Sequence, residues 1–283
     1  MNDDEASPFL GMEIVEQLPH GEGPGAYVVR TSEGTEVVLK VFNSDVLDDT
    51  ARQGDAHMLV ESVRGLGYPA PRLHASGRRA DGTRFEIQDR VPGEPVEQIT
   101  AAHLASVRTL NEMQRGGALE SLAGHTFLDD LVRTVVEGAD GYCEHEAMRA
   151  HSDATRSLLD RLRGIAEAGR GARVPIRDVV HYDFSPLNLL AEGDEITGVV
   201  DWDGVRAGDA GFDLVTLAFY TYDFAVRDEL LAMTRGRTPP RALALYAAHM
   251  VLRQVDWSLR HQSEIEVEWF MGVGEALVGR VAS

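Results

Sequence analysis

One segment restricts the fold of this chain more than any other: the run HYDFSPLN, which extends from His181 to Asn188. It places a carboxylate, Asp183, five residues before an amide side chain, and a second carboxylate, Asp201, follows eighteen residues after Asp183. The residues before Asp201, 196–200, form a short apolar run that is typical of a buried strand. The pattern predicts a loop, a strand and a second loop that bring three oxygen-bearing side chains into one site.

Phosphoryl transfer needs such a set of groups. Its transition state spreads negative charge over the transferred oxygens, so the protein mainly positions groups and neutralises charge. One carboxylate must orient the attacking hydroxyl and accept its proton, and hard oxygen ligands must hold Mg²⁺ against the phosphates. We therefore predict Asp183 as the catalytic residue and Asn188 and Asp201 as the magnesium ligands. His181 is predicted to be structural, holding the loop by hydrogen bonds.

A single lysine supports the same chemistry. Of the 27 basic residues, 26 are arginine and one, Lys40, is lysine. It lies in the β-branched run VVLKVF at 37–42. A chain that uses arginine for almost every positive charge is expected to keep lysine where a compact ammonium group is required and a planar guanidinium does not fit. We predict that Lys40 binds nucleotide phosphates; the alternative is that compositional drift left one lysine by chance.

The hydrophobic pattern divides the chain into a strand-rich first part and a helical second part. The first part has a predicted helix at 50–66 and predicted strands at 13–17, 26–30, 36–42 and 84–90. The second has predicted short strands at 178–180 and 196–200 and predicted helices at 213–234, 240–261 and near 264–280. Three further helices are predicted: one capped by Thr100 with apolar positions at 104–113, one with apolar positions at 128–135, and one with apolar positions at 158–165 that ends near Gly169. The proline- and glycine-rich residues 91–95 form the predicted linker. The fold class is therefore α+β, with a small β-rich lobe, 1–91, and a larger helical lobe, 92–283.

The charge balance excludes several classes of partner. Subtracting 46 acidic from 27 basic residues gives a net charge of −19, which repels nucleic-acid phosphates and anionic lipid headgroups and favours cationic small molecules. We therefore expect no nucleic-acid partner and no membrane partner. The sequence has no apolar run of transmembrane length, its N-terminal residues are too acidic for a signal peptide, and Cys143 is its only cysteine, so a cytoplasmic location is expected.

Together these segments resemble the aminoglycoside phosphotransferase and choline kinase family, which are small-molecule kinases with a protein-kinase-like fold. The segments that match are VVLKV around Lys40, GYPAPR from Gly67, DRVPGEP from Asp89, VHYDFSPLNLL from Val180, GVVDW from Gly198 and GDAGFDL from Gly208. The resemblance implies a protein-kinase-like two-lobed fold in which Lys40 binds the phosphates of ATP. It also implies that the backbone of Asp89 and Val91 binds the adenine, and it leaves the choice between ATP and GTP open.

The sequence departs from that family at two positions. Members often carry glycine between the histidine and the catalytic aspartate, where this chain has Tyr182, which either lines the substrate pocket or packs away from it. The family also pairs its lysine with an acid on the first helix, where the register here gives His57, with Asp55 and Glu61 nearby. In addition, the glycine-rich residues 21–25 either cover the nucleotide phosphates or form a flexible hairpin.

Acidic and aromatic residues gather where this family builds its substrate pocket. Converging carboxylates attract a polycation, and aromatic rings add cation–π contacts. The predicted substrate-binding residues are Tyr182, Asp203, Asp223, Asp256, Glu264 and Glu268, accompanied by Tyr220, Tyr222, Glu229, Trp257, Glu266 and Trp269. Each acid taken alone can equally be a solvated surface residue, so the prediction concerns their combined field. Asp213, before an apolar helical run, is predicted to cap that helix and to support the catalytic loop.

The resemblance and the acidic pocket together predict an ATP- and Mg²⁺-dependent kinase that phosphorylates a hydroxyl of a small molecule. The leading substrate is an antibiotic, either an aminoglycoside or a basic peptide of the viomycin and capreomycin type, and its phosphorylation would confer resistance. One alternative is a metabolic kinase that acts on choline, a sugar or homoserine. Another is a catalytically silent binding protein that keeps the fold, against which the intact Lys40, Asp183, Asn188 and Asp201 argue.

Overall fold

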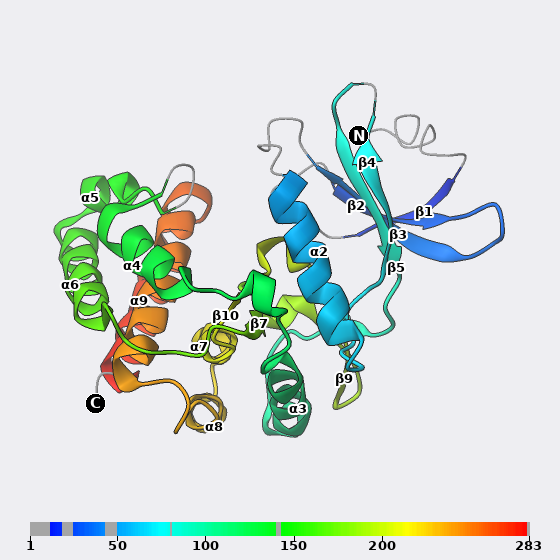
Figure 1. The fold of residues 1–283 in the computed structure, drawn as a ribbon. Coiled ribbons are helices and arrows are strands. Elements are labelled where there is room, and N and C mark those ends of the chain that lie inside the picture. Colours follow the sequence, from blue (N-terminus) through cyan, green and yellow to red (C-terminus); the bar gives the residue numbers. More distant parts are fainter. Residues whose placement is uncertain (1–11, 19–24, 43–49, 80, 140–142, 282–283) are drawn as a thin grey trace.

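An antiparallel sheet forms the N-terminal part of the computed structural model, which describes residues 12–18, 25–42, 50–79, 81–139 and 143–281 (Figure 1). The strand order is β1-β2-β3-β5-β4, and every neighbouring pair is antiparallel. The strands are β1 (Glu13–Leu18), β2 (Gly25–Arg30), β3 (Glu36–Phe42), β4 (Leu73–Arg78) and β5 (Arg84–Asp89). Mostly β-branched residues fill its core, with one aromatic residue and one leucine: Tyr27, Val29, Val37, Leu39, Val41 and Ile87.

Helix α2 (Thr50–Arg64) lies between β3 and β4 in the chain and packs against β7 (Asp178–Val180) and β10 (Arg206–Gly208) of the catalytic segment. Its buried residues Leu59 and Val63 belong to the apolar cluster that contains Val179 and Trp202, which flank the catalytic loop. Figure 1 shows α2 between the sheet and the C-terminal helices. The chain then turns at Gly67, whose φ of +92° lies in the left-handed region that glycine adopts without a Cβ clash.

The C-terminal part is helical and is built around one long central helix. The helices are α3 (Leu104–Gln114), α4 (Phe127–Glu137), α5 (Glu146–His151), α6 (Asp153–Gly169), α7 (Gly211–Tyr220), α8 (Phe224–Ala232), α9 (Pro240–His261) and α10 (Glu264–Val281). α9 packs against α4, α5, α6, α7 and α10, and thirteen of its residues are buried, from Ala242 to Ser258. Because α9 also reaches the catalytic loop, its packing fixes the position of that loop.

Short strands carry the catalytic loop between these two parts. β7 (Asp178–Val180) pairs with β10 (Arg206–Gly208), and β6 (Glu94–Pro95), β8 (Leu189–Glu192) and β9 (Glu195–Val199) form a small sheet. The loop of the HYDFSPLN motif connects β7 to β8 and includes a short 3₁₀ turn, Pro186–Asn188. The predicted fold class is confirmed: an antiparallel sheet is followed by a mostly helical part, as in protein-kinase-like folds.

Several elements differ from the sequence-based expectation. β4 was not expected because its sequence, LHASGR, is polar and contains glycine, yet it pairs along β5 at the edge of the sheet. The short α5 and the three-residue β10 fall below the length at which periodicity is readable. The helical region predicted at 213–234 is two helices, because Asp223 caps a new one by accepting hydrogen bonds from the backbone of Ala225 and Val226.

Among the described helices, none has both the length and the apolar composition needed to cross a bilayer. The glycine-rich residues 21–24 lie outside the described residues, so neither interpretation of that loop is tested. The division into lobes at 91/92 also stays a prediction.

Candidate active site

The catalytic loop holds Asp183 and Asn188 against each other. The Asn188 side-chain nitrogen donates to the backbone oxygen of Asp183 at 2.8 Å and to its carboxylate Oδ2 at 3.1 Å. The backbone of Asn188 also accepts from the amide of Val200 at 2.9 Å, which brings the next residue, Asp201, to the same end of the site. The three oxygen-bearing residues of the motif therefore converge as their spacing predicted.

Asp213 of α7 supports this loop from beneath. Its carboxylate accepts from the backbone amide of His181 at 2.7 Å and from that of Tyr182 at 2.9 Å. The side chain of Gln114 donates a third hydrogen bond at 2.6 Å. Burial raises the pKa of Asp213, and these donors oppose that shift. The predicted support of the catalytic loop is thus present in the structure. The predicted cap is wrong, because α7 begins at Gly211 with Ala210 as its N-cap and Asp213 lies inside its first turn.

The His181 ring is also part of the scaffold. It is buried, its Nε2 lies 2.9 Å from the backbone oxygen of Val200, and it packs against Trp202 with ring centroids 4.5 Å apart. This contact ties the strand that leads to Asp201 to the start of the catalytic loop. The structural role predicted for His181 agrees with this geometry.

Lys40 reaches the same site from β3. Its Nζ lies 2.5 Å from Asp201 Oδ1 and 3.6 Å from Asp203 Oδ1, and its side chain is only 16% exposed. Burial alone would lower the pKa of Lys40, but the two carboxylates, Asp203 and Asp201, offset it and raise the pKa. Lys40 is therefore a charged ammonium group, held between two acids of the segment predicted to bind metal.

The sequence left open which acid pairs with Lys40, and among the described residues its ion pairs are with Asp201 and Asp203 of the metal segment, not with an acid of the first helix. Glu61 is paired with Arg64 at 2.9 Å on its own helix, and Asp55 lies on a groove described below. Glu86 stands directly across the sheet from Lys40, and burial followed by the charge of Asp203 raises the pKa of Glu86. Helical register alone could not predict the partners of Lys40, because Asp201 and Asp203 approach it from the C-terminal part.

The residues predicted to bind Mg²⁺ fit that ion. Because the Asn188 amide nitrogen is engaged by Asp183, its amide oxygen is the atom available to a cation. The Asp201 carboxylate is 45% exposed and uses one oxygen for Lys40. One carboxylate and one amide oxygen suit Mg²⁺, which keeps several waters and shares its remaining positions with phosphate oxygens. Among the described residues no cluster of three or more histidine, cysteine, aspartate or glutamate side chains could hold a metal by itself.

The predicted adenine-binding segment lies at the end of β5. The amide of Asp89 donates to the backbone oxygen of Arg72 at 3.0 Å, so a nucleotide base would have to use the carbonyl oxygen of Asp89. Its side chain lies 2.6 Å from His74 Nε2. Val91 packs closely over β9, where a Cβ added to Gly198 would come within 2.5 Å of Val91 Cγ1. Glycine at 198 therefore permits this segment to lie against β9.

Tyr182 packs into the helical part instead of facing the cleft. Its ring is 8% exposed and stacks on Phe212, with centroids 5.0 Å apart at 11°. The Arg206 guanidinium covers the other face at 3.6 Å, and the hydroxyl lies 2.9 Å from His249 Nε2. Of the two alternatives for Tyr182, the structure therefore favours packing over a place in the substrate pocket. Its φ of +76° explains why glycine also suits this position.

Three of the predicted substrate-binding acids have partners within the protein. Asp203 pairs with Lys40, Asp223 caps α8, and Asp256 is buried and paired with Arg260. These three acids have structural partners, which the sequence pattern could not reveal because each partner depends on the fold. Glu264 and Glu268 are exposed at the start of α10.

A pair of exposed aromatic residues connects α10 to the segment that follows α7. Trp269 and Tyr222 meet edge to face with centroids 4.9 Å apart, and they are 42% and 51% exposed. Tyr220, two residues earlier, lies near Asp183: burial raises the pKa of Tyr220 to about 12, while Arg253 lowers it and Asp183 raises it. The aromatic surface, defined here as Tyr222 and Trp269, thus includes one residue that follows Glu268 in α10 and one that follows Tyr220 by two residues.

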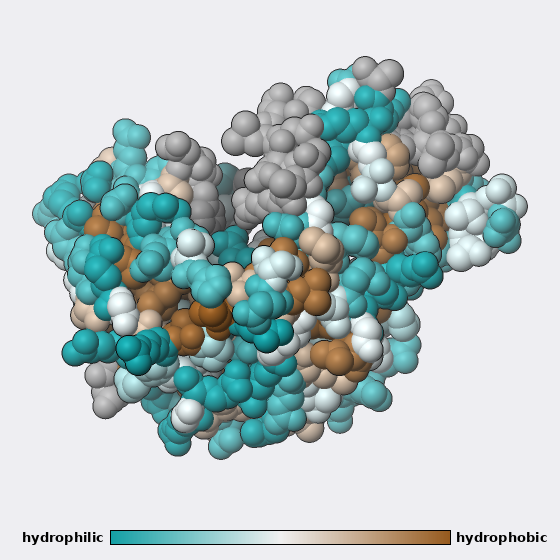
Figure 2. All heavy atoms as spheres, in the orientation of Figure 1, coloured by the Kyte–Doolittle hydropathy of each residue, from teal (hydrophilic) through white to brown (hydrophobic). Residues whose placement is uncertain are grey.

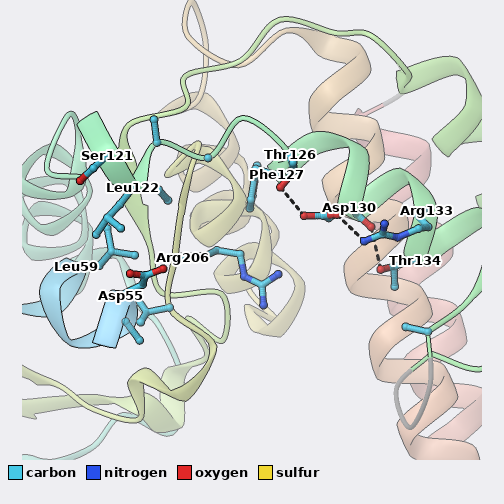
Figure 3. Close-up of a pocket in the computed structure, with 16 residues that line it drawn as sticks. Asp55, Leu59, Ser121, Leu122, Thr126, Phe127, Asp130, Arg133, Thr134 and Arg206 are labelled. Atoms are coloured by element: carbon cyan, nitrogen blue, oxygen red, sulfur yellow. Dashed lines mark hydrogen bonds and ion pairs between the residues drawn. The ribbon is translucent and has the colours of Figure 1, made fainter. Parts of the chain in front are cut away.

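A groove of about 610 Å³ lies on the other side of the catalytic loop, between α2 and α4 (Figure 3). Its lining includes Asp55, Leu59, Ser121, Asp130, Arg133 and Arg206. Asp130 is neutralised within the groove, since it accepts from Arg133 at 2.6 Å. Figure 2 shows this face of the molecule as mostly hydrophilic, with apolar patches near its centre. The groove is one side chain away from the catalytic loop, because Arg206 stacks on Tyr182.

Two residues near Asp183 were missed by the sequence analysis. Arg253 of α9 lies with its Nη2 3.2 Å from Asp183 Oδ1, and His249, one turn earlier, contacts Tyr182. Their i, i+4 spacing places both on one face of α9. No local motif predicts a role for either residue, because the sequence pattern of α9 indicates only a buried helix.

The sheet, the helical part and the catalytic loop between them define a protein-kinase-like fold. The model of the phosphotransferase enzyme family matches residues 14–246, and the chain belongs to this family. A curated relative, hygromycin-B 4-O-kinase of Escherichia coli, is 27% identical over 107 residues. That match spans 36% of this chain and 31% of the relative's length.

Solved structures agree with this fold over the full chain. A thermostable variant of aminoglycoside phosphotransferase APH(4)-Ia, in complex with AMP-PNP and hygromycin B, superimposes with a TM-score of 0.71 at 20% identity and covers 100% of this chain and 99% of its own. Choline kinase LicA from Streptococcus pneumoniae gives 0.58 at 16% identity, covering 99% of this chain and 97% of its own. At these identities the likeness shows the shared fold.

Proposed function

We propose that the protein transfers the γ-phosphoryl group of ATP to a hydroxyl of a cationic small-molecule antibiotic and so confers resistance to it. The observation that carries this proposal is the convergence of Lys40, Asp183, Asn188 and Asp201, which come from one strand and two loops far apart in sequence. Membership in the phosphotransferase enzyme family supports the reaction class. Curated and structural relatives named for hygromycin B support an aminoglycoside as the acceptor.

In the proposed reaction Asp183 orients the acceptor hydroxyl and takes up its proton. The hydroxyl oxygen forms the new bond to the γ-phosphorus while the bond to the β–γ bridging oxygen breaks, which leaves ADP. Asn188 and Asp201 would hold Mg²⁺, which when bound neutralises charge on the phosphate oxygens. Lys40 would turn from the acids to the nucleotide phosphates. Carbonyl and amide groups at Asp89 and Val91 are proposed to bind the adenine.

A cationic acceptor is supported by the charge of the chain and by exposed acidic and aromatic residues of the helical part. The net charge of −19 attracts cations over a distance. Glu264 and Glu268 are exposed at the start of α10, the helix that also carries Trp269 of the aromatic surface. Exposed rings add cation–π contacts of about 0.5–1 kcal/mol each.

The test is an acceptor panel with purified protein and Mg·ATP, followed by mapping of the phosphorylated hydroxyl by NMR. The panel contains hygromycin B, viomycin, capreomycin, choline and homoserine, and Asp183→Asn protein serves as the matched control. We expect phosphorylation of hygromycin B or of one of the basic peptides. Exclusive turnover of choline or homoserine would instead support a metabolic kinase, a reading favoured by the likeness to choline kinase. ATP binding without transfer to any acceptor would contradict the proposal.

A further inference from the structure

We propose that Arg253 of α9 is the positioning residue that orients the Asp183 carboxylate for phosphoryl transfer, an inference that rests on the proposed function. Its Nη2 lies 3.2 Å from Asp183 Oδ1, and its Nη1 donates to the backbone oxygen of Tyr182 at 2.7 Å. The two nitrogens of one planar guanidinium thus hold both the side chain of Asp183 and the peptide that precedes it. A fork of this kind fixes direction as well as position.

Both carboxylate oxygens of Asp183 then have a defined partner. Oδ1 is next to Arg253, and Oδ2 accepts from Asn188 at 3.1 Å. A carboxylate held at one oxygen can rotate about its last bond, whereas one held at both oxygens cannot do so without losing a contact. The remaining lone pairs of Asp183 therefore keep a single direction, which is what an acceptor hydroxyl needs for in-line attack.

The exposed fractions of the two side chains show which side of Asp183 is left for an acceptor. Arg253 is 12% exposed, whereas Asp183 is 48% exposed. The guanidinium therefore lies on the protein side of the carboxylate, and the outer side of the carboxylate faces solvent. Arg253 acts through Asp183 in this arrangement, and it leaves room for a substrate.

The helix that carries Arg253 is anchored for this role. His249, one turn earlier on α9, lies 2.9 Å from the Tyr182 hydroxyl, so two successive turns of one helix contact the catalytic loop. α9 is itself packed among the other C-terminal helices. This double attachment also supports the left-handed backbone of Tyr182, whose φ of +76° is unfavourable for a side chain of its size.

A salt bridge that only stabilises the fold would have different consequences. Removing it would lower the free energy of unfolding and affect every activity equally. A positioning residue would instead lower kcat at unchanged nucleotide affinity, and its removal would have no further effect once Asp183 itself is replaced. α9 offers a matched control, because Arg260 on the same helix pairs with Asp256 away from the catalytic loop.

The experiment compares Arg253→Gln, Arg253→Lys and the control Arg260→Gln for phosphate transfer from Mg·ATP to hygromycin B and, without acceptor, to water. We expect Arg253→Gln to lower kcat about 100-fold, the effect of a misplaced reacting group, with the Kd for Mg·ATP within about twofold of wild type. Arg253→Lys should recover part of the loss, and Arg260→Gln should keep its kcat. In an Asp183→Asn background, Arg253→Gln should cause no additional loss.

Several outcomes would overturn the inference. They are a kcat for Arg253→Gln within about twofold of wild type, an equal loss in Arg260→Gln, or losses that simply multiply in the double variant. If Arg253→Gln does not fold, the Arg253→Lys variant tests the inference instead. A positioning role requires the kcat of Arg253→Lys to fall while its Kd for Mg·ATP stays unchanged. Wild-type protein that transfers phosphate neither to hygromycin B nor to any other acceptor of the panel, nor to water, would overturn the proposed function, and this inference with it.

Discussion

The two sides of the candidate site differ in how they are built. On the nucleotide side, Asn188 and Asp201 lie next to the ends of the paired strands β8 and β9, and Lys40 reaches them from β3. On the acceptor side, Arg253 of α9 and Tyr220 of α7 lie near Asp183, and these two helices meet through the packing of the helical part. The first side is specified by local spacing, and the second by long-range packing.

This difference explains which predicted residues converge. The motif residues lie together because each is within a few residues of a strand end. The substrate-binding acids were predicted from their place in the region where the resembled family builds its pocket, and three of them have partners within the protein, as the cap of α8 by Asp223 illustrates. A region of the sequence is thus a weaker predictor of a side chain's place than a fixed spacing.

The largest expected effect is at Asp183, where the two sides meet. Asp183→Asn keeps the shape but removes the proton acceptor and its charge, so we expect kcat to fall by about 1,000-fold. Because Asn188 can still bond the backbone oxygen of Asn at this position, the Kd for Mg·ATP and the unfolding midpoint should change little. Steady-state kinetics and calorimetric titration measure these quantities. Near wild-type turnover in folded protein would remove Asp183 from the catalytic role.

The second prediction compares the two proposed metal ligands. Asp201→Ala removes an anionic ligand and should abolish the dependence of nucleotide binding on Mg²⁺, whereas Asn188→Ala removes a neutral oxygen and should weaken it less. Calorimetric titration of ATP with and without Mg²⁺ decides between them. Unchanged metal dependence in Asp201→Ala would show that the Mg²⁺ ligands lie elsewhere.

The third prediction concerns the lone lysine. Lys40→Arg keeps the charge, but its longer, planar group cannot act as a compact point charge between two phosphates. We expect kcat/KM to fall about 100-fold in both Lys40→Arg and Lys40→Ala, the loss typical of one charge-stabilising contact. An arginine variant that keeps most of its turnover would mean that the single lysine is a compositional accident.

The fold and the nucleotide side could be predicted because their signals are local. Alternation of β-branched residues fixes the strands, and HYDFSPLN fixes the loop. The partner of Lys40 could not be predicted, because Asp201 and Lys40 are brought together by the packing of α2 and the sheet against the catalytic segment. Arg253 was missed for the same reason: it lies seventy residues after Asp183 in a helix whose pattern indicates only burial.

The fourth prediction tests how firmly α9 holds the loop. Burial, followed by the charges of Arg253 and Arg206, holds the pKa of His249 well below its usual range, so the folded protein keeps this ring neutral. The unfolded chain binds the proton near the ordinary value of about 6.5. As the pH falls below that value, the unfolded state is favoured, and the free energy of unfolding should drop by up to about 1.4 kcal/mol per pH unit.

The variant His249→Gln isolates this contribution from general acid effects, since it does not titrate. Urea unfolding at about pH 7.5 and about pH 5.5 should show a steeper loss of stability in the wild-type protein than in His249→Gln. Parallel losses in the two proteins would mean that His249 is not buried as a neutral group, and that the attachment of the loop to α9 is looser than described.

The smallest expected effect lies on the acceptor side and tests the substrate class. Glu264→Gln combined with Glu268→Gln should raise the KM for a polycationic acceptor about fivefold, since each exposed charge contributes at most about 1 kcal/mol in water. Glu266 is left in place because it accepts from the backbone and hydroxyl of Ser263 at the start of α10, so its replacement would also weaken the helix. The matched control, Glu192→Gln with Glu195→Gln, makes the same charge change on the exposed β8–β9 turn.

Salt provides the independent measurement. Raising the ionic strength to physiological values shortens the screening length to about 8 Å, so the KM of the wild-type protein should rise with salt and approach that of the α10 double variant. The KM for ATP should stay constant in all three proteins, because Lys40 and the catalytic loop are unchanged. A salt-independent KM for the acceptor would exclude a polycationic substrate. It would leave the phosphotransferase reaction standing, because that reaction depends on the nucleotide side, where the side chains are held by short-range contacts that salt screens far less.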